Sequence, residues 1–167
     1  YNDYSWNTHA NMIYLESPAG TGYSYTENGI YYNDDVTTGE DNLHALISFF
    51  KKFPQFRKND FYITGESYAG VYVPYLANNV NFYNTLVPES EAINFKGMMV
   101  GNGVTDAVED TNETTRAYDI SHNIISDKTS QEYFDACLEP GSQQCRKIKN
   151  EINYFIQNID VYHIYKE

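Results

Sequence analysis

Short runs of apolar, β-prone residues alternate with helical patterns over the first hundred residues, and this alternation is the strongest constraint on the fold. Residues 61–64 (FYIT) and 95–100 (FKGMMV) are two such runs, each followed by glycine. A third run at 11–15 (NMIYL) is closed by the turn-like sequence SPAGTG. Strands that alternate with helices are typical of a parallel α/β sheet. We therefore expect a strand over each run.

Two helices are predicted, one before and one after the run at 61–64. Asp34 and Asp35 are acidic residues suited to the start of the first helix, and Gly65 precedes the second. Pro74 lacks an N–H group, so we expect a kink in the first turns of the second helix. Apolar residues at helical spacing are Leu43, Leu46, Ile47 and Phe50 in the first helix, and Val73, Leu76, Ala77 and Val80 in the second.

The strand signals stop near residue 112. Beyond it the sequence is more polar, and apolar residues recur at helical spacings: Ile120, Ile124, Ile125, Ile148, Ile152, Phe155, Ile156 and Ile159. We interpret residues 1–112 as part of an α/β core and residues 113–167 as a helical insertion, or cap, laid over its sheet.

The charge of the chain excludes two classes of partner. It has 11 Lys and Arg residues against 23 Asp and Glu residues, which gives a net charge of −12. Such a surface repels nucleic-acid phosphates and anionic lipid headgroups. No run approaches the roughly 18 apolar residues that a membrane span requires. Neither nucleic acid nor a membrane is expected as a partner.

Residues 65–70 (GESYAG) lie where the second predicted strand turns into a helix, which is the setting of a G-x-S-x-G nucleophile elbow. Small residues, Gly65 and Ala69, stand two positions before and after Ser67, because the turn is too tight for larger side chains there. The turn would lift the Ser67 Oγ above the sheet edge, and the Tyr68 N–H would face an oxyanion. Ala69 departs from the general pattern, and a serine between glycines also occurs in ordinary tight turns.

Several further motifs accompany this turn in a fixed order: YSWN, ESPAGTGYSY, KKFP, GESYAGVYVPYLA and VGNGVTD. Together, over residues 4–106, they resemble the serine carboxypeptidase family of the cathepsin A and vacuolar carboxypeptidase type. The resemblance accounts for Ala69 and Pro74. It implies part of an α/β-hydrolase fold, with a mostly parallel sheet and the start of a helical insertion. The implied activity is acid-favoured release of C-terminal residues from peptides without a cofactor, and a related acyltransferase is a close variant.

The resemblance also implies roles for individual residues. Ser67 would be the acylated nucleophile, Tyr68 would supply one oxyanion N–H, and Glu66 would bind the terminal carboxylate of the substrate. In this family a second glutamate, expected before residue 1, faces the one next to the nucleophile, so that one carboxyl of the pair is protonated. Tyr23 and Tyr25 are candidates for the lining of the cleft, and ordinary core aromatic residues are the alternative.

The chain has four histidines, but none occupies the family's position for the catalytic base. The triad Asp and His of this family follow the helical insertion. His122 and His163 follow Ser67 in the chain, and we interpret both as structural or surface residues. His9 and His44 precede Ser67 without a recognisable motif. No histidine spacing matches a metal motif, so no metal site is predicted.

We therefore expect this chain to hold one triad member and to be a processed or incomplete portion. Its partners would be a peptide substrate and the remainder of its own polypeptide or a companion chain, with a homodimer as a further option. The alternative is a non-catalytic, hydrolase-like subunit of a larger assembly.

Glu16, in ESPAG, is interpreted as a structural carboxylate that binds loop N–H groups.

Two modifications are expected from the sequence. Cys137 and Cys145 flank a loop that contains Pro and Gly, and we expect both to be oxidised. A mutual disulfide is the first choice, pairing with cysteines outside the chain the second, and two free thiols the third. Asn112 begins the only N-x-[ST] sequon and is expected to carry a glycan. These features suit a lysosomal, vacuolar or secreted protein.

Overall fold

The structure is a computed structural model that describes all residues except 107–109, 111–113, 140 and 167. It divides into two compact units, Tyr1–Thr105 and Asp106–Glu167. Among the described residues, no helix is both long enough and apolar enough to cross a bilayer. The predicted glycosylation site at Asn112 lies outside the described residues and stays a prediction, as does the division of the whole protein into core and insertion at residue 112.

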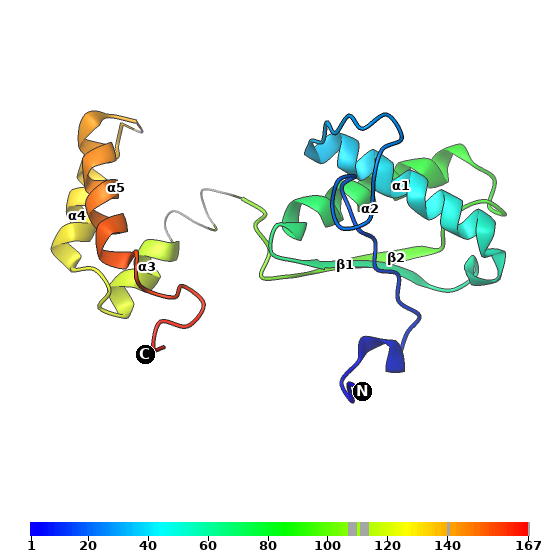
Figure 1. Ribbon diagram of the computed structural model, residues 1–167, viewed down its shortest axis with the longest axis horizontal. Coiled ribbons are helices and arrows are strands. Elements are labelled where there is room, and N and C mark those ends of the chain that lie inside the picture. Colours follow the sequence, from blue (N-terminus) through cyan, green and yellow to red (C-terminus); the bar gives the residue numbers. More distant parts are fainter. Residues whose placement is uncertain (107–109, 111–113, 140, 167) are drawn as a thin grey trace. The chain divides into compact units, whose positions relative to one another are not determined.

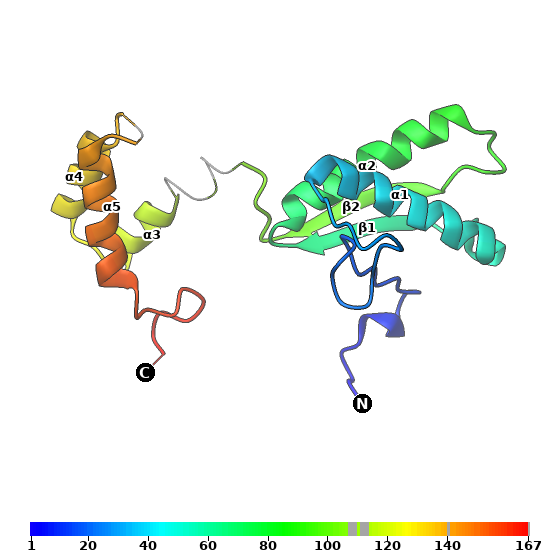
Figure 2. The ribbon, with the colours of Figure 1, turned by 45° about the horizontal axis from the view of Figure 1, so that its top comes forward.

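The first unit is built on two parallel strands, β1 (Phe61–Glu66) and β2 (Phe95–Gly101). Helix α2 (Ala69–Leu86) lies against both strands, and α1 (Asp35–Lys52) lies alongside α2 (Figures 1 and 2). Two short 3₁₀ helices, η1 (Trp6–Thr8) and η2 (Pro54–Phe56), complete its regular structure. Two of the three predicted strands and both predicted helices are therefore confirmed.

Local sequence explains where α1 begins and ends. The Asp34 carboxylate accepts a hydrogen bond from the Thr37 N–H at 2.7 Å, and the Thr37 hydroxyl accepts one from the Asp34 N–H at 3.0 Å. This reciprocal capping satisfies donors that the first helical turn leaves unpaired. Lys51 and Lys52 complement the negative end of the helix dipole, and Pro54 follows the end of the helix.

The predicted helical pattern forms the core of the first unit. Side chains from α1, α2, β1 and the segment before β2 are buried together: Leu46, Phe50, Ile63, Val73, Leu76, Ala77, Val80 and Ile93. Helix α2 continues through Pro74, so the missing N–H does not end it. Six of the eight apolar positions predicted for the two helices are in this core, while Leu43 and Ile47 are half-buried.

The prediction of a strand over residues 11–15 is wrong. This segment has no regular structure, and Ile13, Tyr14 and Leu15 are exposed. A strand is defined by hydrogen bonds to a neighbouring strand, and within the described residues the only sheet contains β1 and β2. Residues 11–15 instead line one side of a groove of about 980 Å³ beside β1, without pairing to it.

The second unit is helical, as the isoleucine pattern predicts. It contains α3 (Thr114–Ser121), α4 (Asp127–Ala136) and α5 (Gln143–Ile156). Ser126 and Ser142 cap α4 and α5, because each hydroxyl accepts a hydrogen bond from a backbone N–H of the first turn. A small apolar core joins α5 to the loop after α3 through Ile125, Ile148 and Ile152.

The structure joins Cys137 and Cys145 in a disulfide, the first of the pairings expected from the sequence. Cys137 caps the end of α4, and Cys145 lies in the first turn of α5, where it is 1% exposed. The bridge therefore connects two packed helices across the short loop between them. Its stabilisation comes mainly from the restriction that it places on the unfolded chain.

Reduction of this disulfide should lower the free energy of unfolding of the second unit by about 2.5 kcal/mol, the loop-closure value for a sequence separation of eight residues. Chemical denaturation with and without reductant measures the difference. A variant with serine at both positions serves as the control, because reductant should not change its stability. Equal midpoints for the oxidised and reduced wild-type chain would contradict the prediction.

Candidate active site

Ser67 lies in the tight turn between β1 and α2, with φ = +64°. This left-handed conformation is rare for a residue with a side chain and is found at sites that the surrounding structure over-determines. Three backbone hydrogen bonds hold it. The Ser67 N–H donates to the Gly101 carbonyl at 2.9 Å, while the Ser67 carbonyl accepts from the N–H groups of Gly70 and Val104, each at 3.0 Å. The side chain itself is exposed.

The glycines around Ser67 allow two close backbone approaches. A Cβ at Gly65 would lie 2.4 Å from the Ala69 Cβ, and a Cβ at Gly70 would lie 2.4 Å from the Val104 carbonyl oxygen. Both distances are far shorter than any van der Waals contact. Helix α2 can therefore start directly after the strand and pack against the loop after β2 only with glycine at both positions.

Tyr68 follows Ser67 and caps the start of α2. Its hydroxyl donates to the Asp35 carboxylate, 3.2 Å from Oδ2 and 3.4 Å from Oδ1, and its ring lies 5.0 Å from that of Tyr72. The negative charge of Asp35 raises the pKa of the Tyr68 phenol above its ordinary value. The phenol therefore stays protonated at any pH near neutrality. Sequence reasoning identified Asp35 only as a residue of the helix start.

Two groups of this turn are available to a ligand. The Tyr68 N–H donates to no acceptor among the described residues, and the Ser67 hydroxyl likewise has no described hydrogen-bond partner. The arrangement can thus present a nucleophile and an oxyanion donor on adjacent residues. It does not bring a base to Ser67 within the described part of the chain.

Glu66 is the last residue of β1 and is exposed beside Ser67. Its carboxylate has no partner in the part of the chain that the structure describes, so it too can contact a ligand. Tyr68, Ser67 and Glu66 are therefore three consecutive residues with groups free for binding. The structure therefore presents these three sequence-predicted residues on one exposed turn.

A model of the serine carboxypeptidase family matches residues 1–167, the whole chain. This chain belongs to the serine carboxypeptidase family. Serine carboxypeptidase 24 of Arabidopsis thaliana is 44% identical over 98% of the chain and 36% of its own length. Serine carboxypeptidase-like 26 of Oryza sativa subsp. japonica is 41% identical over 99% of the chain and 35% of its own length. The chain thus spans about a third of these relatives.

A solved structure shows the fold of this serine carboxypeptidase chain. The prohormone-processing carboxypeptidase from Saccharomyces cerevisiae superimposes with a TM-score of 0.64, at 20% identity, over 84% of this chain and 34% of the yeast chain. The parallel pair β1–β2, joined through the elbow and α2, is consistent with part of an α/β-hydrolase fold. The family and the fold class predicted from sequence are both confirmed.

The remaining predicted residues of this serine carboxypeptidase chain lie away from the elbow in sequence. Tyr23 and Tyr25 are 94% and 75% exposed in the first unit, and their role in lining a cleft stays a prediction. Glu16 accepts a hydrogen bond from the Tyr23 N–H at 2.6 Å, and its carbonyl accepts one from the Ser24 hydroxyl at 2.7 Å. Glu16 therefore organises this loop, as the sequence suggests.

One histidine contacts only residues close to it in sequence, and the other three are exposed. His122 stacks on Tyr118 with ring centroids 4.0 Å apart, and its Nδ1 lies 3.0 Å from both the Ser121 hydroxyl and the Tyr118 carbonyl. These contacts stay at the end of α3, which agrees with a structural role. His9, His44 and His163 are exposed. Among the described residues there is no group of three His, Cys, Asp or Glu side chains that could hold a metal ion.

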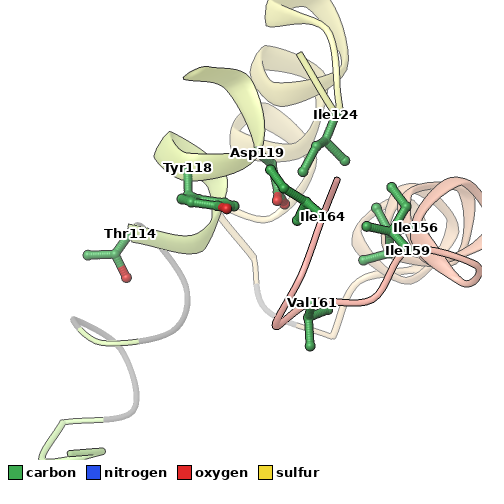
Figure 3. A pocket seen from close by; sticks show the side chains of 8 residues that line it. All are labelled: Thr114, Tyr118, Asp119, Ile124, Ile156, Ile159, Val161 and Ile164. Carbon is green, nitrogen blue, oxygen red and sulfur yellow. The ribbon is translucent and has the colours of Figure 1, made fainter. Parts of the chain in front are cut away.

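The second unit contains a cavity of about 440 Å³ that sequence reasoning missed (Figure 3). Its lining is apolar apart from Thr114, Tyr118 and Asp119, and it includes Ile156 at the end of α5 and Ile164 near the end of the chain. The Asp119 side chain is only 8% exposed and has no hydrogen-bond partner among the described residues. Burial raises the pKa of this carboxyl above its ordinary value of 3.8.

The raised pKa of Asp119 contributes to the stability of the second unit in acid. The folded state binds the Asp119 proton more tightly than the unfolded chain does, so the contribution is full below pH 3.8 and is lost as the pH rises through the raised pKa. Asp119→Asn should therefore show a smaller fall in thermal midpoint than the wild type between about pH 4 and pH 7. The exposed Glu139→Gln serves as the matched control and should behave as wild type. Identical pH profiles for Asp119→Asn and the wild type would refute this assignment.

Proposed function

We propose that the polypeptide carrying this chain is a serine-type carboxypeptidase that releases C-terminal residues from peptides through an acyl-enzyme on Ser67. The observation that carries the proposal is the exposed Ser67 hydroxyl in a left-handed turn between β1 and α2, in a chain that belongs to the serine carboxypeptidase family. A serine whose backbone is held in a left-handed conformation by three hydrogen bonds fits the geometry of a nucleophile elbow.

The chemistry follows from the groups around Ser67. Its Oγ attacks the carbonyl carbon of the last peptide bond and gives its proton to a general base. The oxyanion that forms accepts a hydrogen bond from the Tyr68 N–H. Collapse breaks the C–N bond, and the base returns the proton to the leaving amine. Water then hydrolyses the ester and regenerates Ser67.

Glu66 explains why the proposed reaction would be restricted to the C-terminal end of a peptide substrate. Its exposed carboxyl beside the nucleophile can meet the terminal carboxylate of a peptide. A second carboxyl group nearby, supplied by residues outside this chain, would raise one pKa of the pair. The protonated member then donates a hydrogen bond to the substrate carboxylate, which favours activity in acid.

We infer that the base comes from outside residues 1–167. Ser67 has no described partner, and this chain spans about a third of its curated relatives. We propose that the triad Asp and His are on the remainder of the polypeptide or on a companion chain, and that residues 1–167 alone are inactive. The disulfide in the second unit supports an oxidising location, either a vacuole, a lysosome or the cell exterior.

The experiment compares peptides that differ only at their C-terminus. The complete protein should release the last residue of a peptide with a free carboxylate, and it should be inactive on the same peptide with a C-terminal amide. Failure of both peptides to react, together with failure of a fluorophosphonate to label Ser67, would establish a non-catalytic subunit instead. Preferential transfer of the acyl group to an added alcohol would establish an acyltransferase.

A further inference from the structure

We propose that Asp35 is a positioning residue that holds Tyr68, and through it the oxyanion-binding N–H, in the geometry required for acylation. The inference rests on the proposed function and adds to it a residue outside the nucleophile turn. It starts from a single long-range contact. The Tyr68 hydroxyl donates to the Asp35 carboxylate at 3.2 Å, across 33 residues of sequence and between two different helices.

The acceptor is held rigidly. Asp35 is the first residue of α1, directly after the capping pair formed by Asp34 and Thr37. About one turn further on, α1 crosses α2 at Gly39, where a Cβ would lie only 3.2 Å from the Tyr75 Cβ. This contact fixes the start of α1 against the first half of α2. The Asp35 carboxylate is half-buried beside the Tyr68 hydroxyl as a result.

The hydrogen bond to Asp35 anchors the elbow through a side chain, in addition to its backbone hydrogen bonds. The hydrogen bond that the Ser67 N–H donates to the Gly101 carbonyl, and those that the Ser67 carbonyl accepts from Gly70 and Val104, fix the backbone of Ser67. The Ser67 carbonyl and the Tyr68 N–H belong to one planar peptide unit, so these bonds also orient the N–H that is proposed to bind the oxyanion and that has no described acceptor of its own. The Tyr68 side chain is held at its ring by Tyr72 and at its hydroxyl by Asp35.

Oxyanion stabilisation depends steeply on placement. Loss of one donor typically costs about a hundredfold or more in kcat, and a displacement of about 1 Å costs a comparable factor. Loosening one support of Tyr68, whose carbonyl also accepts a hydrogen bond from the Val71 N–H at 2.9 Å, should cost less, about tenfold. The effect should appear in kcat rather than in KM, because the oxyanion exists only after attack and not in the bound substrate.

Four variants of the complete protein test the inference. Asp35→Ala and Tyr68→Phe should each lower kcat about tenfold and change KM less than twofold, and the rate of fluorophosphonate labelling should fall in parallel. The double variant should be no slower than either single one, because both remove the same hydrogen bond. Asp35→Asn should retain at least half of the wild-type kcat, since its amide oxygen still accepts a hydrogen bond.

Two controls separate positioning from general damage. Tyr83→Phe removes a hydroxyl with no described partner from α2, and Asp41→Ala removes an exposed carboxylate from α1. Both should keep wild-type kcat. If Asp35→Ala fails to fold, the kcat of Tyr68→Phe alone tests the inference, because this variant leaves the start of α1 intact. Wild-type kcat in Tyr68→Phe, or a hundredfold loss in the double variant, would overturn the inference while leaving the proposed function standing. Absence of turnover in the wild type would instead overturn both.

Discussion

Ser67→Ala lowers kcat of the complete protein roughly 10⁶-fold, if Ser67 is the nucleophile that the elbow geometry indicates. Removing the hydroxyl leaves the base and the oxyanion donor without an atom to activate. The measurement is release of the C-terminal residue from a peptide, with fluorophosphonate labelling of the same protein. Ser90→Ala is the control, because Ser90 is exposed and has no described partner. Substantial turnover by Ser67→Ala would exclude an acyl-enzyme at this residue.

Ser67→Gly separates function from fold in the same experiment. It should be as inactive as Ser67→Ala, but about 1 kcal/mol more stable than the wild type, because glycine adopts φ = +64° without the cost that a side chain imposes. The activity loss therefore cannot be attributed to unfolding. A Ser67→Gly variant that is more stable but inactive would indicate that the wild-type turn keeps a strained conformation that the hydroxyl requires.

The chain of residues 1–167, expressed alone, should not react with the fluorophosphonate even when folded. An isolated serine hydroxyl is a weak nucleophile, and the turn orients Ser67 without deprotonating it. Labelling of the complete protein but not of the short chain would locate the base outside these residues. Efficient labelling of the short chain would instead identify His122 or His163 as the base.

Local signals allowed much of this fold to be predicted. The 3.6-residue pattern of α1 and α2 and the glycines of the elbow depend on neighbours in sequence, so Leu46 and Val80 are buried as expected. The run at 11–15 was misassigned because a strand requires a hydrogen-bonded neighbour that sequence periodicity does not report. Its run of apolar residues is the same whether or not a neighbouring strand is present to pair with it.

Sequence reasoning missed two features of the candidate sites for a related reason. The hydrogen bond between Asp35 and Tyr68 joins residues on two helices, and a residue at a helix start already has a sufficient local explanation. The buried Asp119 has no motif around it and becomes notable only when α3 and the end of the chain enclose it. Contacts between distant segments leave no periodic signal, so only three-dimensional structure reveals them.

Gly70→Ala should lower the free energy of unfolding of the first unit by about 2 to 3 kcal/mol and reduce kcat about a hundredfold. The added Cβ would lie 2.4 Å from the carbonyl oxygen of Val104 and 2.8 Å from its nitrogen, and backbone atoms cannot rotate away as a side chain can. Helix α2 must therefore move from the loop after β2. That movement stretches the hydrogen bond from the Val104 N–H to the Ser67 carbonyl, which holds the nucleophile in its turn.

Gly97→Ala provides the matched control for this prediction. Gly97 lies within β2, and the nearest atoms that a Cβ would meet belong to the Tyr62 ring at 3.8 Å, an ordinary contact. Its stability should stay within about 0.5 kcal/mol of the wild type, and its kcat should not change. Denaturant midpoints and peptide turnover measured on both variants distinguish the effect of position from the effect of an added methyl group. If Gly70→Ala matched Gly97→Ala in both measurements, the close approach of α2 to Val104 would not be what holds Ser67 in place.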